Sequence, residues 1–598
     1  MYRQLVVEAA FLHTKPDCYF VGSYAQRVSF ASQQIRALDL ISGLRLVREE
    51  DFARREPLIA VVGAGLAGMM ATSALREIDG GAGRIKVHMY EFGDDVLTKH
   101  RDASHRLVHP TINRWPFEPI EHSSALPMFN WCAIACDKVM AQVRKEWEGR
   151  KPPPFLPPKG RRTVPLQDFM MVSGVRVERI DSWTDPIAFD AAEKSRLVLD
   201  KTVNGLTDSQ GVVKHKYDLV IVATGYGIEN RKVHATTKTY WQYEELESEI
   251  QAESRKHDAH KRNYYVTGCG DGGLVDLLRI MHGDFNAGWL TVMAAKALEG
   301  TAIAREIKAA EFDALRWARS IFTLEPDIAV HPAGAIRPDK MDEVDTIVSR
   351  RLQPVYQQLV ARLNGHFNRK DSREDRAKYD AVSKVLNQSL EKVRMANHVF
   401  LVAPLPAPYK PFAAPIHKLL IAHALSQGKF AYRQGQQTDN YLTLTGHTTV
   451  YGADPMVRII PRHGTDASET GILLKDERRS LRLRQVMLAD WIRSARDDDL
   501  AYTNPLAAKP AQGEKLDLYF NHIRDLFTAM DDRFELTLEE NGLACCQRGE
   551  STRPSENCAR ILGYDHGVAL DLPEKVFGTI DIRRGGVPDF PVLGGDPG

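Results

Sequence analysis

Leu58-Ile-Ala-Val-Val-Gly63-Ala-Gly65-Leu66-Ala67-Gly68-Met-Met-Ala-Thr-Ser-Ala-Leu75 decides the fold, because an apolar strand runs through a Gly-x-Gly-x-x-Gly turn directly into a helix. The first glycine permits the tight turn, the second lets backbone approach a pyrophosphate, and the third lets the helix pack on the strand. The N-terminus of that helix then faces the phosphates. A second strand over 85–90 ends in Glu91, at the separation where an acid binds a ribose hydroxyl. The stretch therefore predicts a dinucleotide site in an α/β fold.

Two later stretches repeat this chemistry. A strand over 217–222 ends in Ala223-Thr224-Gly225, where glycine leaves bare backbone that can lie against a ligand. Further on, a strand leads through Gly268-Cys269-Gly270-Asp271-Gly272-Gly273 into a helix. The pattern turns helical and charged over about 286–397, and strand character returns at 398. With this helical insertion removed, 263–283 and 398–464 reassemble into a second β-α-β nucleotide module.

The 598 residues are too many for one ordinary domain. We expect an N-terminal extension over 1–56, with a strand over 18–21 and a helix through Ile35 and Ile41, docked on a first nucleotide-binding domain over 57–262. The second module spans 263–464, and a C-terminal region with a basic helix around 478–496 follows over 465–598. A helix from about 126 to 147 would place Cys132 and Cys136 on neighbouring turns.

Composition gives no support to several classes of partner. Lys plus Arg (79) nearly equals Asp plus Glu (78), without blocks of like charge, so nothing indicates nucleic acid or an anionic membrane surface. No apolar segment is long enough to span a bilayer, and the N-terminus is unlike a secretory signal. The seven cysteines lack the paired spacing of a zinc site, which indicates reduced thiols and no metal. We expect a cytoplasmic protein.

With both glycine turns and the Ala-Thr-Gly strand, the chain resembles the flavoproteins with two dinucleotide-binding domains, the class around glutathione reductase and the flavin-containing monooxygenases. The resemblance implies a Rossmann-like FAD-binding domain and a second dinucleotide-binding module, interrupted here by the helical insertion. It implies that FAD binds to the first turn and Glu91, and that the Ala-Thr-Gly strand leads toward the nicotinamide domain. NAD(P)H would bind to Gly268, Gly270 and Gly273.

The second turn departs from that class at Asp271, where a neutral residue is more usual and a carboxylate would repel a pyrophosphate. The strand over 398–402 also ends without an acid for a ribose. An alternative interpretation has Asp271 accept hydrogen bonds from the hydroxyls of the FAD ribityl chain. One domain would then bind FAD alone, and the substrate rather than NAD(P)H would supply the electrons.

The segment after Glu91 is rich in cationic side chains. Arg106 and His109 are the residues that we expect to contact cofactor or substrate, because arginine neutralises phosphate and histidine exchanges protons near neutral pH. No residue is assigned as a catalytic acid or base. The sequence favours an FAD-dependent oxidoreductase that passes electrons from NAD(P)H to a small molecule. The alternatives are a single-site FAD oxidase and a non-catalytic nucleotide-binding scaffold or sensor, with a protein partner or a second copy bound through the helical insertion.

Overall fold

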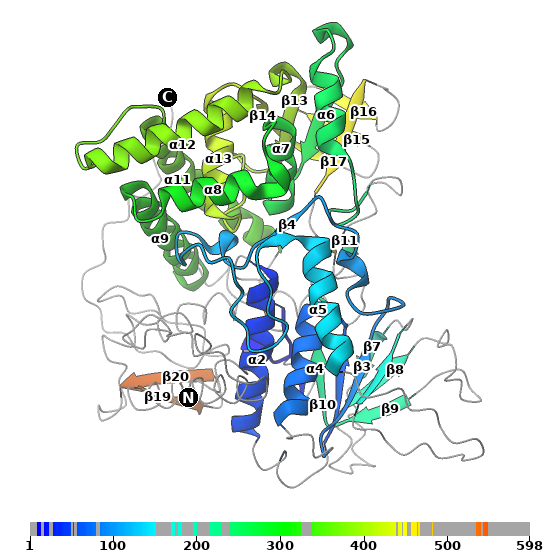
Figure 1. The fold of residues 1–598 in the computed structure, drawn as a ribbon. Coiled ribbons are helices and arrows are strands. Elements are labelled where there is room, and N and C mark those ends of the chain that lie inside the picture. The colour runs from blue at the N-terminus through cyan, green and yellow to red at the C-terminus, as the bar shows by residue number, and fades with distance from the viewer. Residues whose placement is uncertain are drawn as a thin grey trace.

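Two sheets organise the protein, one among the blue and cyan elements and one among the green and yellow elements of Figure 1. The structure is a computed structural model. It describes residues 7, 9–12, 17–22, 28–48, 52, 57–78, 84–150, 169–173, 177–181, 195–199, 214–225, 228–229, 238–324, 338–437, 441–444, 447–450, 456–462, 465–466, 481, 534–539 and 542–547.

The first sheet has five parallel strands in the order β1-β10-β2-β3-β6. Their apolar sequences suit a sheet that is covered on both faces. The bounds are β1 Cys18–Phe20, β2 Leu58–Val62, β3 Lys86–Tyr90, β6 Phe169–Val172 and β10 Leu219–Val222. A separate antiparallel sheet lies between β6 and β10 in the chain, formed by β7 Val177–Asp181, β8 Ser195–Leu199 and β9 Lys214–Tyr217.

Three helices share one apolar core with this sheet: α2 (Phe30–Val47), α4 (Leu66–Ile78) and α5 (Cys136–Arg150). α2 begins in a capping box, in which Ser29 and Ser32 bond each other's backbone N–H groups. The expected N-terminal strand and helix are therefore present, and β1 adds to the edge of the sheet beside β10. We call this sheet, its three helices and the segment 91–135 the first module.

The second sheet has the order β16-β15-β14-β13-β12-β17. β12, β13, β14 and β17 are parallel, whereas β15 and β16 form an antiparallel extension. The bounds are β12 Asn263–Thr267, β13 Val399–Ala403, β14 Ala431–Gln437, β15 Tyr441–Leu444, β16 His447–Val450 and β17 Val457–Pro461. This sheet with α7 (Asp271–Met281) and α13 (Pro415–Ser426) is the second module.

The two modules have the same strand order. If the edge strand β1 is left aside, the third, second, first and last parallel strands along the chain lie side by side as β6-β3-β2-β10 in the first module and as β14-β13-β12-β17 in the second. The fold class is therefore α/β, with two Rossmann-like sheets.

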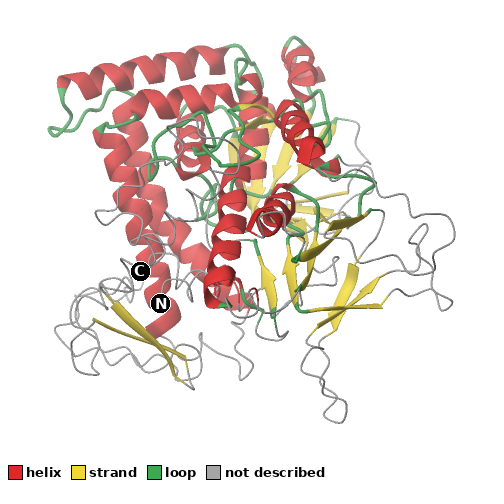
Figure 2. Ribbon diagram, turned by 60° about the horizontal axis from the view of Figure 1, so that its bottom comes forward, coloured by secondary structure: helices red, strands yellow, loops and turns green. Residues whose placement is uncertain are grey.

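Between α7 and β13 the chain forms α8 (Trp289–Leu298), α9 (Ala302–Leu324), α11 (Pro338–Leu363) and α12 (Arg373–Glu391). Side chains of all four helices join one apolar cluster with α7, α13 and the second sheet. We call the second module together with these four helices the second half of the molecule. Figure 2 shows helices gathered to one side of the sheets. The domain boundaries that the sequence suggests remain predictions.

The chain crosses twice between the modules, and the crossings lie together. β11 (Ile228–Glu229) follows the first sheet, β18 (Thr465–Asp466) follows the second, and the two pair antiparallel. Ile228 lies opposite Asp466, and Glu229 lies opposite Thr465. The connection is thus a short two-stranded ribbon.

The helix expected from 126 is wrong over its first ten positions, because α5 begins only at Cys136. Ala125 and Phe129 have positive φ, and Phe129 and Trp131 are buried in the first core, so this stretch folds as irregular turns. Cys132 is exposed and Cys136 is buried, and they do not share a helix.

The remaining elements are short or isolated. They are η1 Thr98–His100, β4 Leu107–Val108, η2 Ile112–Arg114, β5 Ile134–Ala135, α6 Leu246–Ser254, η4 Asp258–His260, η5 Asn286–Gly288, η6 Ala396–His398, β19 Phe534–Glu539 and β20 Gly542–Gln547. The basic helix expected over 478–496 lies outside the described residues except for Leu481. Within the described part, no helix combines the length and apolarity that crossing a membrane requires.

Candidate functional site

The first glycine turn, between β2 and α4, has the shape that its sequence predicts. Gly63 has φ +106°, and its N–H bonds Tyr90 O at 2.7 Å, which ties the turn to β3. A Cβ added at Gly68 would lie 1.8 Å from the Gly63 carbonyl oxygen, so helix and strand approach as closely as only glycine allows. A Cβ at Gly65 would meet nothing within 4 Å. Backbone at Gly65 is thus open for a ligand.

The end of β10 lies against this turn. A Cβ at Gly63 would come within 2.6 Å of the Ala223 carbonyl oxygen and 3.1 Å of the Thr224 Cα. Gly225 follows with φ +68°, in the left-handed region. The two motifs, far apart in sequence, therefore meet at one edge of the sheet.

Leu66 and Ala67 begin α4, and their side chains pack into the apolar core of the first module. What they offer a ligand is therefore backbone. The first N–H groups of a helix lack helical partners and carry partial positive charge, which favours phosphate at this end.

Glu91 lies at the same turn, directly after β3. Its Oε2 accepts the Ala64 N–H at 2.6 Å, and its Oε1 accepts the Gly93 N–H at 2.8 Å. A carboxylate has about four acceptor positions. Glu91 is thus fixed beside the turn with capacity left for a hydroxyl donor.

The second turn, between β12 and α7, repeats this geometry. Gly268 has φ +102°, and its N–H bonds Val402 O at 2.8 Å on the adjacent strand. A Cβ at Gly273 would lie 1.9 Å from the Gly268 carbonyl oxygen, whereas one at Gly270 would meet nothing within 4 Å. The matching strand registers align Gly268 with Gly63.

The same alignment shows where the turns differ. Ala403 is buried at the place of Glu91, so the second turn has no acid at the strand end. Asp271 occupies the place of Leu66 and is the first residue of α7. Its Oδ1 accepts the Ala414 N–H at the start of α13 and pairs with His417 Nδ1, both at 2.8 Å. This carboxylate oxygen is therefore engaged within the second module. The two glycine turns belong to different sheets.

Arg462 marks a third difference. It follows β17 at the position of Ala223, and its N–H bonds Thr267 O at 2.8 Å just as the Ala223 N–H bonds Val62 O. Its side chain is buried and reaches back to α7, where Nε bonds Asp276 Oδ2 at 2.6 Å. A small residue in one module is thus an ion-pairing residue in the other.

Arg106 is buried at the boundary between the modules, with only 1% of its surface exposed. Nη1 lies 2.5 Å from Asp276 Oδ1, and Nε donates to Tyr240 O at 3.0 Å. The guanidinium carbon lies 3.8 Å above the Tyr240 ring centre. The structure therefore gives the Arg106 guanidinium partners within the protein, and its predicted contact with cofactor or substrate remains a prediction.

His109 is also buried. Its Nδ1 accepts the N–H groups of Thr111 and Ile112, at 3.3 and 3.2 Å, which places the proton of the neutral ring on Nε2. Nε2 has no hydrogen-bond partner within the described part of the chain. Burial and, to a smaller extent, the nearby His122 lower the pKa of His109 to about 4. His109 is therefore a neutral ring with an unpaired N–H donor.

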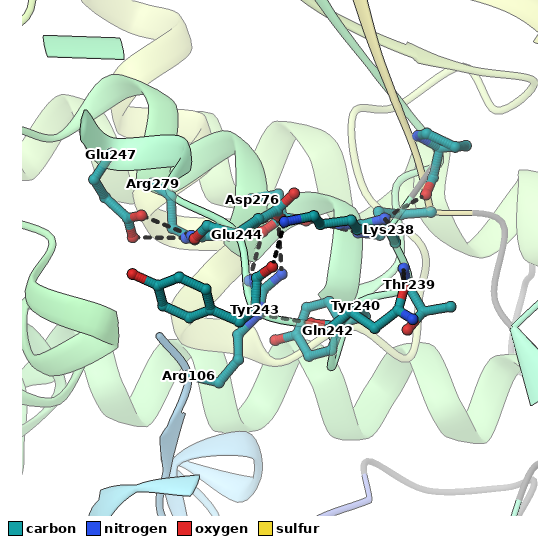
Figure 3. Close-up of polar contacts among 12 residues, drawn as sticks. Arg106, Lys238, Thr239, Tyr240, Gln242, Tyr243, Glu244, Glu247, Asp276 and Arg279 are labelled. Atoms are coloured by element: carbon teal, nitrogen blue, oxygen red, sulfur yellow. Dashed lines mark hydrogen bonds and ion pairs between the residues drawn. The ribbon is translucent and has the colours of Figure 1, made fainter. Parts of the chain in front are cut away.

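Sequence reasoning named Arg106 but missed its partner Asp276 and the neighbouring Arg279, Glu244 and Glu247, which Figure 3 shows. The available signal was local: Asp276 and Arg279 lie three positions apart among leucines on the buried face of a helix. Unpaired charges are rarely buried there, so both required partners.

This is an α/β protein with two Rossmann-like sheets, and each sheet has a Gly-x-Gly-x-x-Gly turn of matching geometry. No family model matches the chain, and no curated protein matches it in sequence. Among solved structures, it is similar to the bacillithiol disulfide reductase Bdr from Bacillus cereus, with 10% identity and a TM-score of 0.30 over 68% of this chain and 78% of that one.

Two further solved structures are similar to the same extent. An oxidized steroid monooxygenase bound to NADP has 12% identity and a TM-score of 0.26, over 69% of this chain and 73% of its own. OTEMO, in complex with FAD and NADP, has 12% identity and a TM-score of 0.28, over 82% of this chain and 94% of its own. At such low identities and TM-scores, no residue role is carried over from these proteins.

Proposed function

We propose that the protein is an FAD-dependent oxidoreductase that takes electrons from NAD(P)H and delivers them to a small-molecule substrate. The observation that carries this proposal is the first turn. Gly65 is open, Gly63 and Gly68 hold strand and helix in close contact, and Glu91 lies beside them. Open backbone and a helix N-terminus, which suit a pyrophosphate, therefore lie beside an acid that suits a ribose hydroxyl.

The residues present fit FAD. The backbone at Gly65 and the start of α4 would hold the pyrophosphate, Glu91 the adenosine ribose, and the backbone of Thr224 and Gly225 would lie alongside. When bound, FAD supplies the redox chemistry, which no side chain can perform alone. The protein's part is to bind, orient and exclude water.

His109 suits a binding role better than an acid–base role. With a pKa of about 4, its ring is neutral at pH 7 and can donate one hydrogen bond from Nε2. Its ring lies 5.4 Å from that of His122, which in turn lies 6.0 Å from Trp289 on α8. His109 thus lies near the boundary with the second half of the molecule, where a substrate would be reached from both modules.

The second turn supports NAD(P)H by its shape, because Gly268, Gly270 and Gly273 match their counterparts in the first module. The position of Asp271 favours the second candidate, a single-site FAD oxidase that draws electrons from its substrate. A carboxylate at the start of α7 occupies the electrostatically favourable place that a pyrophosphate would use. The pairing of Asp271 with His417 reduces the repulsion between this carboxylate and a pyrophosphate.

The test is an absorbance spectrum of the purified protein, repeated without oxygen after addition of NADPH and then NADH. Flavin bands that bleach on addition support the reductase. Bands that persist, together with hydrogen peroxide formed from a substrate without NAD(P)H, favour the oxidase. No bands after an attempt at FAD reconstitution would overturn both.

A further inference from the structure

Asp276 is the centre of a buried ion cluster at the boundary between the modules (Figure 3). Its side chain is fully buried on α7 and receives three guanidinium groups. Arg106 Nη1 lies at 2.5 Å and Arg279 Nη1 at 3.0 Å from Oδ1, and Arg462 Nε lies at 2.6 Å from Oδ2. Arg106 comes from the first module, whereas the others belong to the second.

Two glutamates complete the cluster. Arg279 forms a bidentate pair with Glu247, at 2.7 and 2.6 Å, and bonds Glu244 Oε1 at 3.0 Å. Three arginines thus meet three carboxylates, so the charges balance. Burial alone would raise the pKa of Asp276, but Arg106, Arg462 and Arg279 lower it below its usual range. The carboxylate is therefore charged at all physiological pH values.

The neighbouring segment 238–243 contacts both modules through two adjacent aromatic rings. Tyr240 lies against Arg106 and beside the second glycine turn, where a Cβ at Gly272 would lie 3.4 Å from its ring. Trp241 stacks on Phe30 at 5.3 Å and meets His100 edge-on at 4.7 Å, both in the first module. Arg106 bonds the Tyr240 carbonyl, so the cluster also fixes this segment.

Apolar contacts, the β11–β18 ribbon and a hydrogen bond from the Ile120 N–H to Glu299 Oε1 at 3.0 Å also hold the modules together. Ile112, Trp115 and Ile120 of the first module are buried in the core of the second half. Apolar contact is non-directional, and the β11–β18 ribbon has only two paired positions. Guanidinium–carboxylate pairs are directional, because the planar donors must face the oxygen lone pairs.

We propose that Asp276 is a positioning residue: by joining Arg106 to Arg462 and α7, it fixes the orientation of the second module relative to the first. Resting on the proposed function, this sets the geometry in which the nicotinamide on the second turn meets the flavin on the first. Because Asp276 is fully buried and paired with three arginines, the proposal gives it no direct contact with either nucleotide. Its effect is on the distance and angle between the two modules.

The first experiment needs no cofactor. Spin labels attached to unnatural amino acids replace Glu148 on α5 and Glu374 on α12, whose side chains are 54% and 78% exposed. They report the distance between the first module and the helices that pack on the second module. Asp276→Asn is expected to broaden or shift the distance distribution. The matched control is Glu311→Gln, which changes a buried carboxylate paired with Lys418 entirely within the second half. It should leave the distribution unchanged.

A distribution that keeps both its width and its mean distance in a folded Asp276→Asn protein would overturn the proposal. If Asp276→Asn does not fold, Arg106→Met removes the connection from the other module and should broaden the distribution. Arg106→Lys keeps the positive charge and should partly restore the narrow wild-type distribution. Equal broadening in Glu311→Gln would also overturn the proposal, because it would indicate general loosening.

The second experiment uses the protein loaded with FAD. In Asp276→Asn, the affinities for FAD and for NADPH should change less than about twofold, since each is set within one module. The single-turnover rate of flavin reduction should fall by about tenfold or more, because transfer needs the reacting atoms in close alignment. An unchanged rate, or parallel loss of both affinities, would overturn the positioning role. A wild-type protein that binds no FAD would refute the proposed function, while the distance measurement would still test Asp276.

Discussion

The first and second modules have the same strand order and the same glycine-turn geometry, but different residues surround their turns. Near the first turn the key positions hold Leu66, Glu91 and Ala223, which leave an acid beside open backbone. At the matching places the second module has Asp271, Ala403 and Arg462, and both charged residues bond the protein itself.

The comparison distinguishes the glycines that the shape of the turn requires from the neighbouring residues that a bound nucleotide would require. The first and third glycines are set by backbone geometry in both modules, because a side chain there would meet a carbonyl oxygen or require a left-handed backbone. The residues around them are free to change. In the second module, Asp271 contacts the start of α13 and Arg462 bonds Asp276 on α7.

The strongest test of the comparison places the same charge in each open turn. Gly65→Asp should lower flavin affinity by about a hundredfold or more, because the carboxylate would occupy and repel the pyrophosphate. The Gly270→Asp protein should still bind flavin, but NADPH should no longer bleach its flavin absorbance bands. Both sites have free space for a side chain, so both proteins should fold. Titration with FAD, followed by flavin fluorescence, measures the first effect, and full flavin occupancy in Gly65→Asp would refute the first-turn assignment.

The third glycines test packing instead of binding. Gly68→Ala should lower the free energy of unfolding by about 3 kcal/mol, since its Cβ would lie 1.8 Å from a backbone oxygen. Gly273→Ala should do the same in the second module, where the distance is 1.9 Å. Gly65→Ala is the control, with little expected change. Urea denaturation compares the three, and equal stability of Gly68→Ala and Gly65→Ala would contradict the close approach.

A buried histidine makes the second module sensitive to acid. Burial lowers the pKa of His423 on α13 from the ordinary value of about 6.5 to about 4. Between these two pH values the histidine is protonated in the unfolded state and neutral in the folded state. Stability should therefore fall as pH drops from 6.5 toward 4, with a loss of about 2 kcal/mol at pH 5 from this residue. Urea denaturation at pH 7.5 and pH 5 should show that His423→Leu removes this part of the loss. An unaltered pH dependence would contradict a neutral His423.

The smallest expected effect comes from Asp271→Asn. The change removes the charge from the start of α7 and weakens the bond to His417, at a cost of about 1 kcal/mol in stability. NADPH affinity should rise by a few-fold or stay the same, while flavin affinity should not change. Isothermal titration with both nucleotides checks this. A fall in flavin affinity would instead support the interpretation in which Asp271 holds the ribityl chain.

Local patterns predicted the parts of the fold that local physics determines. Both turns, the strand ending at Val222 and the helix through Ile35 follow from glycine placement and apolar periodicity. The start of α5 could not be found this way, because burial of Phe129 and Trp131 overrides the helical pattern before Cys136.

The candidate site divides in the same way. Gly63 and Glu91 were predictable because their spacing within one β-α-β unit is fixed. The bond between Arg106 and Asp276 joins residues 170 positions apart, and that between Arg462 and Asp276 spans 186. The first contact depends on how the two modules pack, and the second depends on how distant parts of the second module fold together, so no window of sequence contains either.

The pairing of β11 with β18 makes the second half of the molecule a cassette. The chain leaves the first module at Glu229 and returns at Thr465, its direct partner across the ribbon, so entry and exit lie about 5 Å apart. A hairpin turn of about two residues could join them. The first sheet would keep every strand and every connection after such an excision. The architecture therefore allows the second half to be gained or lost in a single genetic step without rethreading the first.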